Sequence, residues 1–181
     1  MNEKKQFVLR LAREAVHMYA KENKVLLLPA WVPDFLLQEK AGVFVSIKKD
    51  NQLRGCIGTL RATRENLALE IIDMAIEASS KDPRFSRIHA DELASLHYSV
   101  DVLGEPEAIE DQSFLDSQRY GIIVSSGFRR GVLLPNLEGV DSVEQQVSIA
   151  LQKAGIHPQD DYQLERFEVI RYSEMEEDGS S

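Results

Sequence analysis

The sequence predicts an α+β protein in which helices flank a mixed sheet or barrel. Segments with helical spacing of apolar residues follow short segments in which apolar and polar residues alternate. One order of elements, a hairpin followed by a helix and a strand, occurs twice along the chain. We therefore expect residues 1–173 to form one domain of two related halves, at about 42–104 and 120–172, with a pseudo-dyad between them.

The chain opens with a predicted helix over residues 4–22. Its apolar positions recur three or four residues apart and define one face: Phe7, Leu11, Ala15 and Met18. We expect this face to pack on a sheet. The next segment, LLLPAWVPDFLL, carries Pro29 and Pro33, which interrupt helices, so we expect an irregular apolar connection that covers the core.

A β-hairpin is predicted next. Apolar and polar side chains alternate over residues 42–48, and the turn residues Lys, Asp, Asn and Gln occupy 49–52. Residues 53–60, with the sequence LRGCIGTL, then form the returning strand. These two strands and their short turn begin the first half of the repeat.

A helix and a strand complete the first half. Thr63 stands where an N-cap residue is expected, and the apolar positions after it lie on one helical face: Leu67, Ile71, Met74 and Ala78. The dipeptide Asp82-Pro83 ends the helix, because proline disfavours helical geometry in the residue before it. After a connection with a helical turn near 90–94, alternation over 96–102 predicts a strand.

The second half repeats the first. GIIVS at 121–125 matches GVFVS at 42–46, and RGVLL at 130–134 matches RGCIG at 54–58. The offsets are 121 − 42 = 79 and 130 − 54 = 76, so the two hairpins differ by three residues in their turns. This match predicts an internal duplication, and the alternative is that two hairpins with an Arg-Gly step coincide by chance.

The remaining elements of the second half follow the same order. Ser142 is placed to cap a helix that ends at Gly155, and a strand is predicted over 164–172. Beyond this strand the acidic tail at 174–181 lacks apolar anchors, and its composition predicts disorder.

Composition excludes several classes of protein. Thirty acidic residues against 21 basic ones give a net charge of −9, which opposes nonspecific binding to nucleic acid. No apolar run approaches the roughly 20 residues that span a bilayer, and the charged start lacks the apolar centre of a secretory signal. We expect a cytoplasmic protein without a membrane segment.

The segment LRGCIG at 53–58 is the first candidate site. It places Cys56, the one cysteine, between Gly55 and Gly58 and two residues after Arg54. Nearby arginines lower the pKa of a thiol, and glycines let a substrate or another backbone come close. Cys56 is therefore the candidate catalytic residue, with both glycines in the ligand site. The alternative is that Cys56 serves as a small buried hydrophobic residue.

Arginines at equivalent positions predict an anion site. Arg54 and Arg130 begin matching strands, and a pseudo-dyad would bring them to the two sides of one cleft, where they would bind a small anionic ligand. Arg84, in the sequence Asp-Pro-Arg-Phe, is a further ligand candidate. Glu138 is the one carboxylate candidate for acid–base work. Solvated arginines and a simple helix stop are the alternatives.

Other kinds of chemistry have weaker signals. None of the four histidines stands at a spacing that recommends it as a base for Cys56, and His97 comes closest. One cysteine and scattered histidines offer no ligand pair at a recognised spacing, so no metal site is predicted. No phosphate-binding glycine loop is present, and the cofactor is left open.

These motifs resemble the AMMECR domain family, and within it the branch called AmmeMemoRadiSam system protein A. The resemblance spans about residues 7–172 and rests on FVSIKKDNQLRGCIGTL, DPRF, SVDVL, YGIIVSSGFRRGVLLPNLEGVDSVEQQ and KAGI. The family motif LRGCIG is intact at 53–58. The resemblance implies an α+β fold with duplicated halves, which agrees with the repeat in the sequence.

The family has no settled biochemical activity, so the resemblance implies a shared pathway more than a reaction. Its name implies association with a Memo-type protein and a radical SAM protein. One hypothesis is an enzyme that modifies a small molecule, or a binder of an anionic ligand, acting through Cys56 and the arginines. The other is a noncatalytic accessory subunit that docks on those partners. A single cysteine cannot itself hold an iron–sulfur cluster.

Overall fold

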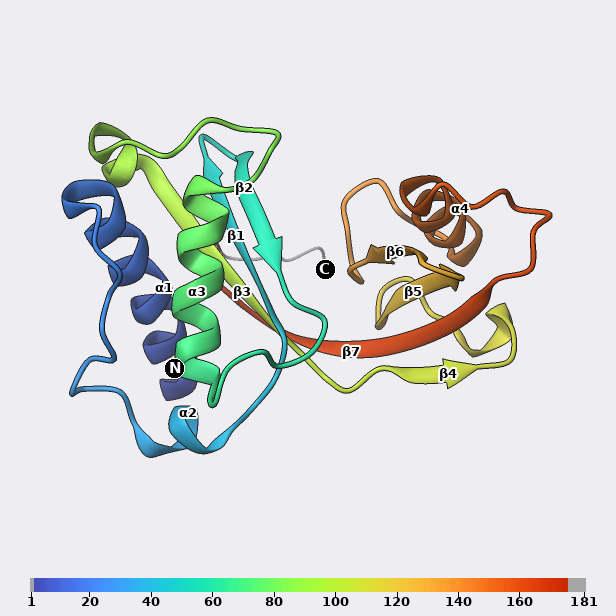
Figure 1. The fold of residues 1–181 in the computed structure, drawn as a ribbon, viewed down its shortest axis with the longest axis horizontal. Helices are drawn as coiled ribbons and strands as arrows, with labels where there is room; N and C mark the ends of the chain where they lie inside the picture. The colour runs from blue at the N-terminus through green and yellow to red at the C-terminus, as the bar shows by residue number, and fades with distance from the viewer. Residues whose placement is uncertain (1, 176–181) are drawn as a thin grey trace. The chain divides into compact units, whose positions relative to one another are not determined.

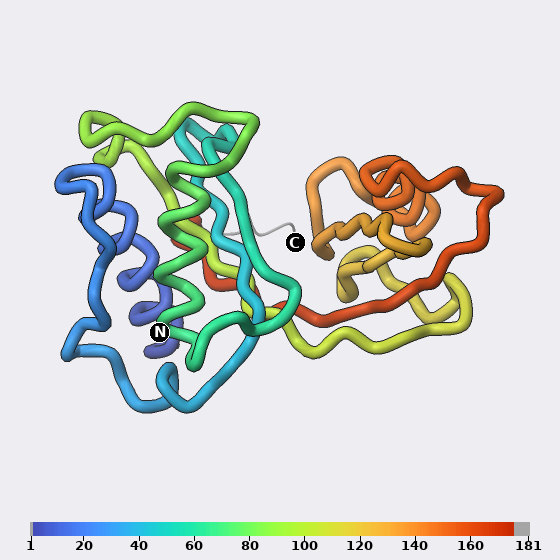
Figure 2. The backbone as a smooth tube through the Cα atoms, in the orientation of Figure 1, coloured from blue at the N-terminus to red at the C-terminus, as the bar shows by residue number. Residues whose placement is uncertain are grey.

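The structure is a computed structural model that describes residues 2–175 of the chain. Its contacts divide the chain into two compact units. Unit 1 comprises Met1–Leu103 and Ile170–Ser181, and unit 2 comprises Gly104–Val169. The chain therefore leaves unit 1 once, builds all of unit 2, and returns to unit 1 near its end (Figure 1, Figure 2).

The described part of unit 1 holds three α-helices: α1 (Glu3–Glu22), α2 (Asp34–Gln38) and α3 (Leu67–Ser80). The start of α3 corrects the sequence prediction, because Asn66 and not Thr63 is the N-cap. The side chain of Asn66 accepts a hydrogen bond from the Leu69 N–H at 2.9 Å. The Thr63 hydroxyl instead donates to Glu70 inside the helix, at 2.7 Å.

Three antiparallel strands follow one another across unit 1 in the order β2-β1-β3: β1 (Val43–Lys49), β2 (Gln52–Gly58) and β3 (Leu96–Leu103). The predicted hairpin of β1 and β2 is present, and its turn narrows to Asp50 and Asn51. Both residues have positive φ, 52° and 62°, as a tight two-residue hairpin turn requires. A 3₁₀ helix, η1 (Ala90–Ser95), leads into β3.

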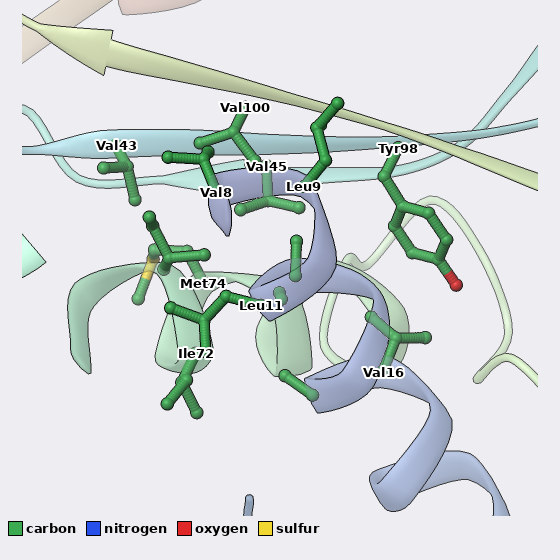
Figure 3. Packing of buried hydrophobic residues seen from close by; sticks show 14 of the residues in the cluster. Val8, Leu9, Leu11, Val16, Val43, Val45, Ile72, Met74, Tyr98 and Val100 are labelled. Atoms are coloured by element: carbon green, nitrogen blue, oxygen red, sulfur yellow. The ribbon is translucent and has the colours of Figure 1, made fainter. Parts of the chain in front are cut away.

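One face of this sheet packs on helices. The fully buried side chains of β1 are Val43, Val45 and Ile47. Figure 3 shows Val45 and Tyr98 of the strands in one cluster with Leu11 of α1 and Ile72 of α3. Because side chains alternate along a strand, Ser46 and its alternate neighbours in β1 point to the opposite face.

Unit 2 is built from two short elements, a hairpin, a helix and a long strand: β4 (Glu107–Ile109), η2 (Gln112–Phe114), β5 (Tyr120–Ser126), β6 (Arg129–Leu133), α4 (Val143–Ala154) and β7 (Gln163–Ser173). β5 pairs with β6 and with β7, and β4 pairs with β7. The predicted ends of α4 are confirmed. Ser142 caps its start, and Gly155 ends it with φ 69°. Nothing in the sequence had indicated β4 or η2.

The α+β class with flanking helices is confirmed. β1 pairs antiparallel with β2 and β3, β5 pairs antiparallel with β6 and β7, and β4 pairs antiparallel with β7. Each unit contains a hairpin, a helix and a following strand, in that order. The last residues of β7 lie in unit 1, where the Glu174 N–H donates to the Tyr98 carbonyl at 3.1 Å.

Strand register changes one detail of the predicted repeat. Gly55 lies opposite Ile47, and Gly131 lies opposite Val124. The two offsets are therefore 131 − 55 = 76 and 124 − 47 = 77, so the hairpins differ by one residue and not by three. The segments GVFVS and GIIVS therefore have similar residues, but they do not occupy equivalent positions in the two hairpins. The internal duplication and the pseudo-dyad stay predictions.

The acidic tail begins with residues that are held in place. Glu174 forms an ion pair with Arg13 of α1, and the Met175 N–H donates to the Ser173 hydroxyl. Residues 176–181, the rest of the tail for which we predicted disorder, lie outside the described residues. Among the residues that the structure describes, no helix has the length and apolar character needed to cross a membrane.

Candidate functional site

The LRGCIG motif lies on β2, the terminal strand of the order β2-β1-β3. Its two glycines are explained by packing. A Cβ atom added at Gly55 would lie 2.1 Å from the Ala78 carbonyl oxygen of α3, and one added at Gly58 would lie 2.3 Å from the Phe44 ring. Both positions therefore admit only glycine, because another part of the chain occupies the space of a side chain.

Cys56 points to the sheet face away from the helices. Its Sγ lies 3.2 Å from the hydroxyl of Ser46, which is directly opposite in β1. Ser99 of β3 is the next residue across in the same row. The polar row Cys56–Ser46–Ser99 is half-buried. Its serine hydroxyls can orient a ligand or form hydrogen bonds within the row.

The thiol of Cys56 is not activated. Burial raises its pKa, and this effect outweighs the lowering that comes from the Ser46 hydrogen bond and from the charge of Arg84. The acidic side chains of Asp101 and Asp82 raise the pKa further. Burial of this half-buried thiol therefore has a larger effect on its pKa than the nearby arginine, and the catalytic role of Cys56 stays a prediction.

The backbone of Cys56 is bound by two side chains that we call the edge clamp, Asp82 and Arg84. The Cys56 N–H donates to Asp82 Oδ2 at 3.0 Å. The Cys56 carbonyl accepts from Arg84 at 3.4 Å, and Arg84 in turn donates to Asp82 at 2.7 and 3.0 Å. The edge clamp occupies the place that the backbone of another strand would take beside β2.

The carboxylate of Asp82 is the centre of the edge clamp. It is almost fully buried, at 4% exposure. The hydrogen bonds from Arg84 and from the Cys56 backbone hold its pKa far below the usual value, with the Arg84 contribution the largest. A charged carboxylate in this position ties the Asp-Pro-Arg-Phe turn to the LRGCIG strand.

Arg54 is engaged by the protein itself. Its guanidinium donates two hydrogen bonds to Glu92, at 2.9 and 3.1 Å, and two more to the carbonyls of Ser86 and Arg87. Arg54 lowers the pKa of Glu92 to about 2, and its hydrogen bond is the largest cause. With only 14% of its side chain exposed, Arg54 holds the loop before η1 and presents little of its charge to a ligand.

The other two candidates lie in unit 2. Arg130 is exposed on β6, where it pairs with Ser125 of β5. Glu138 is exposed in the loop before α4. The predicted pairing of Arg54 with Arg130 across a cleft therefore involves residues of different units, and it stays a prediction.

Comparison with known proteins assigns the chain to a family. The family model described as AMMECR1 matches residues 9–175 of the chain. The chain belongs to the AMMECR1 family. A Thermotoga maritima protein is 47% identical over 166 residues, which cover 91% of this chain and 95% of that protein. The crystal structure of PH0010 from Pyrococcus horikoshii superposes with a TM-score of 0.86 at 32% identity, covering 94% of this chain and 91% of that one.

One AMMECR1-family relative is much longer. Protein CA_C1420 of Clostridium acetobutylicum is 46% identical over 170 residues, which are 92% of this chain. The chain spans only 36% of the length of that relative. In Clostridium, the family domain is thus joined to a larger stretch of other sequence.

Sequence reasoning missed a second buried carboxylate, Glu70 of α3. It is fully buried and accepts hydrogen bonds from the Thr59 and Thr63 hydroxyls and from the backbone N–H groups of Thr63 and Arg64, at 2.7–2.9 Å. Glu70 therefore fixes the loop that follows LRGCIG. The usable signal was the acidic residue on the otherwise apolar face of a predicted helix.

Unit 2 also contains a hollow of about 370 Å³. Its lining includes two arginines and their carboxylate partners, together with Tyr120. Arg119 pairs with Glu168, and Arg166 pairs with Glu107. Each arginine of this hollow is therefore paired with a glutamate, and Glu105 adds a third carboxylate to the lining. Within residues 2–175, no group of three or more His, Cys, Asp or Glu side chains is arranged to hold a metal ion.

Proposed function

We propose that this AMMECR1-family chain is a noncatalytic accessory protein that binds a partner protein through the surface around LRGCIG. The observation that carries this proposal is that the groups expected to perform chemistry instead maintain the fold. Arg54 donates four hydrogen bonds, to Glu92 and to two carbonyls, and the Cys56 thiol is protonated at neutral pH because burial raises its pKa. This use of the motif favours recognition over thiolate catalysis.

The surface available to a partner is formed by β2 and the turn that holds it. Leu53 of β2 is a large apolar side chain with 38% exposure, and the side chain of Arg84 is 57% exposed. Because the edge clamp and the Arg54–Glu92 pair fix both segments, this surface is ordered before a partner arrives. A preorganised surface loses less conformational entropy on binding.

A Memo-type protein and a radical SAM protein are the proposed partners, as the family resemblance implies. The longer Clostridium relative supports a role beside other proteins, since it joins the same domain to further sequence. A domain that is covalently attached to another in one organism can bind its counterpart noncovalently in a second organism. The chain would then take part in the partner's reaction by docking on it, without a reactive Cys56 thiolate.

The proposal is tested by copurification of a Memo-type or a radical SAM protein with tagged variants of the chain. We expect Leu53→Asp to weaken capture at least tenfold, because it places a charge at the apolar contact. Cys56→Ser should leave capture within twofold of the wild type. Leu27→Asp provides the matched control, since Leu27 is also an exposed leucine, at 84%, and lies on the segment before α2.

The enzymatic alternative is tested on the same protein. Iodoacetamide should alkylate native Cys56 slowly at pH 7, with an apparent pKa above that of the denatured chain. Fast alkylation with a depressed pKa, together with loss of function in a folded Cys56→Ser variant, would overturn the accessory role. Equal capture by Leu53→Asp and the wild type would overturn the proposed surface.

A further inference from the structure

The β6 strand forms the outer edge of the sheet in unit 2. It pairs with β5, and among the described strands β5 is its one neighbour (Figure 1). Backbone groups of alternate residues on such an edge point away from the sheet. The Val132 carbonyl accepts from Lys153 Nζ of α4 at 2.9 Å, which identifies Val132 as one of these outward residues. Arg130, two residues earlier, has the same orientation.

The β2 edge of unit 1 and the β6 edge of unit 2 differ in which side chains bind their outward backbone groups. Val132 corresponds to Cys56 by the offset 132 − 56 = 76 that relates the two glycines of the hairpins. At Cys56 the edge clamp binds both the N–H and the carbonyl. At Val132 the described side-chain bond is the one from an exposed lysine to the carbonyl. A flexible lysine is displaced far more easily than a buried aspartate paired with arginine.

The β6 edge is also the place where positive charge gathers in unit 2. This unit has five cationic side chains: Arg119, Arg129, Arg130, Lys153 and Arg166. Arg119 and Arg166 pair with glutamates that line the hollow. Within residues 2–175 the other three have no described carboxylate partner. Arg129 donates to the Gly155 carbonyl, and Arg130 is exposed.

An exposed aromatic side chain lies at the tip of the same hairpin. Phe128, directly before the two arginines, has 96% of its surface exposed, the largest value among the exposed large hydrophobic side chains. A single exposed hydrophobic residue needs no explanation. Next to an outward-facing strand edge and three cations without a described carboxylate partner, however, it supplies an apolar contact for a segment laid along β6.

We infer that the β6 edge binds an extended acidic segment of a partner protein as an added β-strand. The backbone of the guest would pair with the outward groups of Arg130 and Val132, and its carboxylates would contact Arg129, Arg130 and Lys153. The same arginines oppose pairing of β6 with a second copy of itself, because like charges would then face each other. This inference rests on the proposed binding role and specifies the chemistry of one partner segment.

The experiment uses the full chain and a capped seven-residue peptide of alternating glutamate and valine. Nuclear magnetic resonance titration should show saturable shifts at the amides of residues 130–134, with slowed hydrogen exchange at Val132. Arg130→Glu should weaken binding at least tenfold. Lys24→Glu, which changes the charge equally at an exposed position in unit 1, should stay within twofold of the wild type.

A second peptide separates strand pairing from simple charge attraction, and it needs no protein variant. N-methylation of the central backbone amides keeps every carboxylate but removes the donors for pairing, so binding should fall at least tenfold. Equal affinity for both peptides, or no saturable binding of either, would overturn the inference. Copurification that depends on Leu53 is measured separately, so failure of the inference and failure of the proposed function are distinguishable.

Discussion

Asp82 joins two segments that are 26 residues apart in sequence, since it accepts from the backbone of Cys56 and from Arg84. A buried carboxylate is stable only when its charge is compensated. That compensation comes from two backbone N–H groups, those of Cys56 and Arg84, and from the Arg84 guanidinium. The residue-level role of the Asp-Pro-Arg-Phe sequence is therefore to close the edge of β2.

Replacement of Asp82 by Asn tests this role. We expect a loss of about 2–4 kcal/mol in the free energy of unfolding at pH 7, because the Arg84 guanidinium loses its anionic partner. Asp73→Asn is the matched control. Asp73 pairs with the 42%-exposed side chain of Arg64, so its loss should stay below about 1 kcal/mol. Urea unfolding of the three proteins measures both values.

The stability difference between the wild type and Asp82→Asn should decrease at low pH. The pKa of Asp82 is lowered in the folded state, so the unfolded state binds its proton more readily. The stabilisation is complete above the unfolded pKa of 3.8 and declines as the pH falls through the lower folded pKa. The gap between wild type and Asp82→Asn should therefore narrow as unfolding is measured from pH 5 down to pH 2. A gap that stayed constant would contradict the charged role.

Sequence analysis recognised the residues of this region better than their roles. LRGCIG and Asp-Pro-Arg-Phe were both identified, and contact of Gly55 with another backbone was one of the stated alternatives. The partners were not predictable, because Arg54 meets Glu92 and Cys56 meets Asp82 only after the chain has folded. The sequence predicted a lowered pKa for Cys56 because arginines lie near it in the chain. The burial that raises this pKa follows only from the folded structure.

At the scale of elements, one contact recurs in both units. A glycine of the returning hairpin strand lies under an alanine carbonyl of the following helix, Gly55 under Ala78 and Gly131 under Ala150. An added Cβ would meet the carbonyl oxygen at 2.1 Å in each case. The helix can approach the strand this closely only because the side chain is absent.

Gly55→Ala and Gly131→Ala should both destabilise the protein. Each forces the helix from its strand, with an expected loss of about 1–3 kcal/mol or more in the free energy of unfolding. Gly104→Ala is the control, because its added Cβ would lie 3.4 Å from the nearest atom. Thermal and urea unfolding give the comparison. Similar stabilities for all three variants would show that the close approach is dispensable.

Elements with local signals were predicted well. The helices α1, α3 and α4 and both hairpins follow from apolar spacing and turn residues. The N-cap of α3 was misplaced because Thr63, Asn66 and similar polar residues all suit a cap, and tertiary bonds to Glu70 decide between them. β4 has three residues, too few for an alternation pattern.

At the scale of the whole molecule, unit 2 is inserted into unit 1. The end of the chain returns to unit 1 with Tyr172, which is buried in its core, and with Arg171, which pairs with Asp101. Glu174 then pairs with Arg13 of the first helix. The first and last segments of the described chain thus complete the same unit.

Truncation tests this arrangement. Removal of residues 170–181 should expose α1 and α3 to hydrogen exchange, because unit 1 loses a core tyrosine and two ion pairs. Removal of residues 176–181 alone deletes none of the described contacts and should leave exchange unchanged. Hydrogen exchange read by mass spectrometry on both proteins distinguishes the cases. If α1 peptides stayed protected in the chain that lacks residues 170–181, unit 1 would not depend on its closing segment.

The sequence predicted one domain with halves at 42–104 and 120–172, and the contacts group the chain differently. Residues 170–173 of β7 continue the strand of unit 2 yet belong to unit 1. Periodicity shows that a strand exists, but it does not show which sheet each end of the strand joins. That choice depends on contacts far apart along the chain.

The insertion has a consequence for biosynthesis. A ribosome delivers the chain from its N-terminus, so every residue of unit 2 is synthesised by Val169 while unit 1 still lacks its closing segment. Unit 2 can therefore fold as it leaves the exit tunnel, ahead of the unit that was begun first. Tyr172, which belongs to the core of unit 1, is synthesised only after all of unit 2, so the core of unit 1 is completed later than the chain of unit 2.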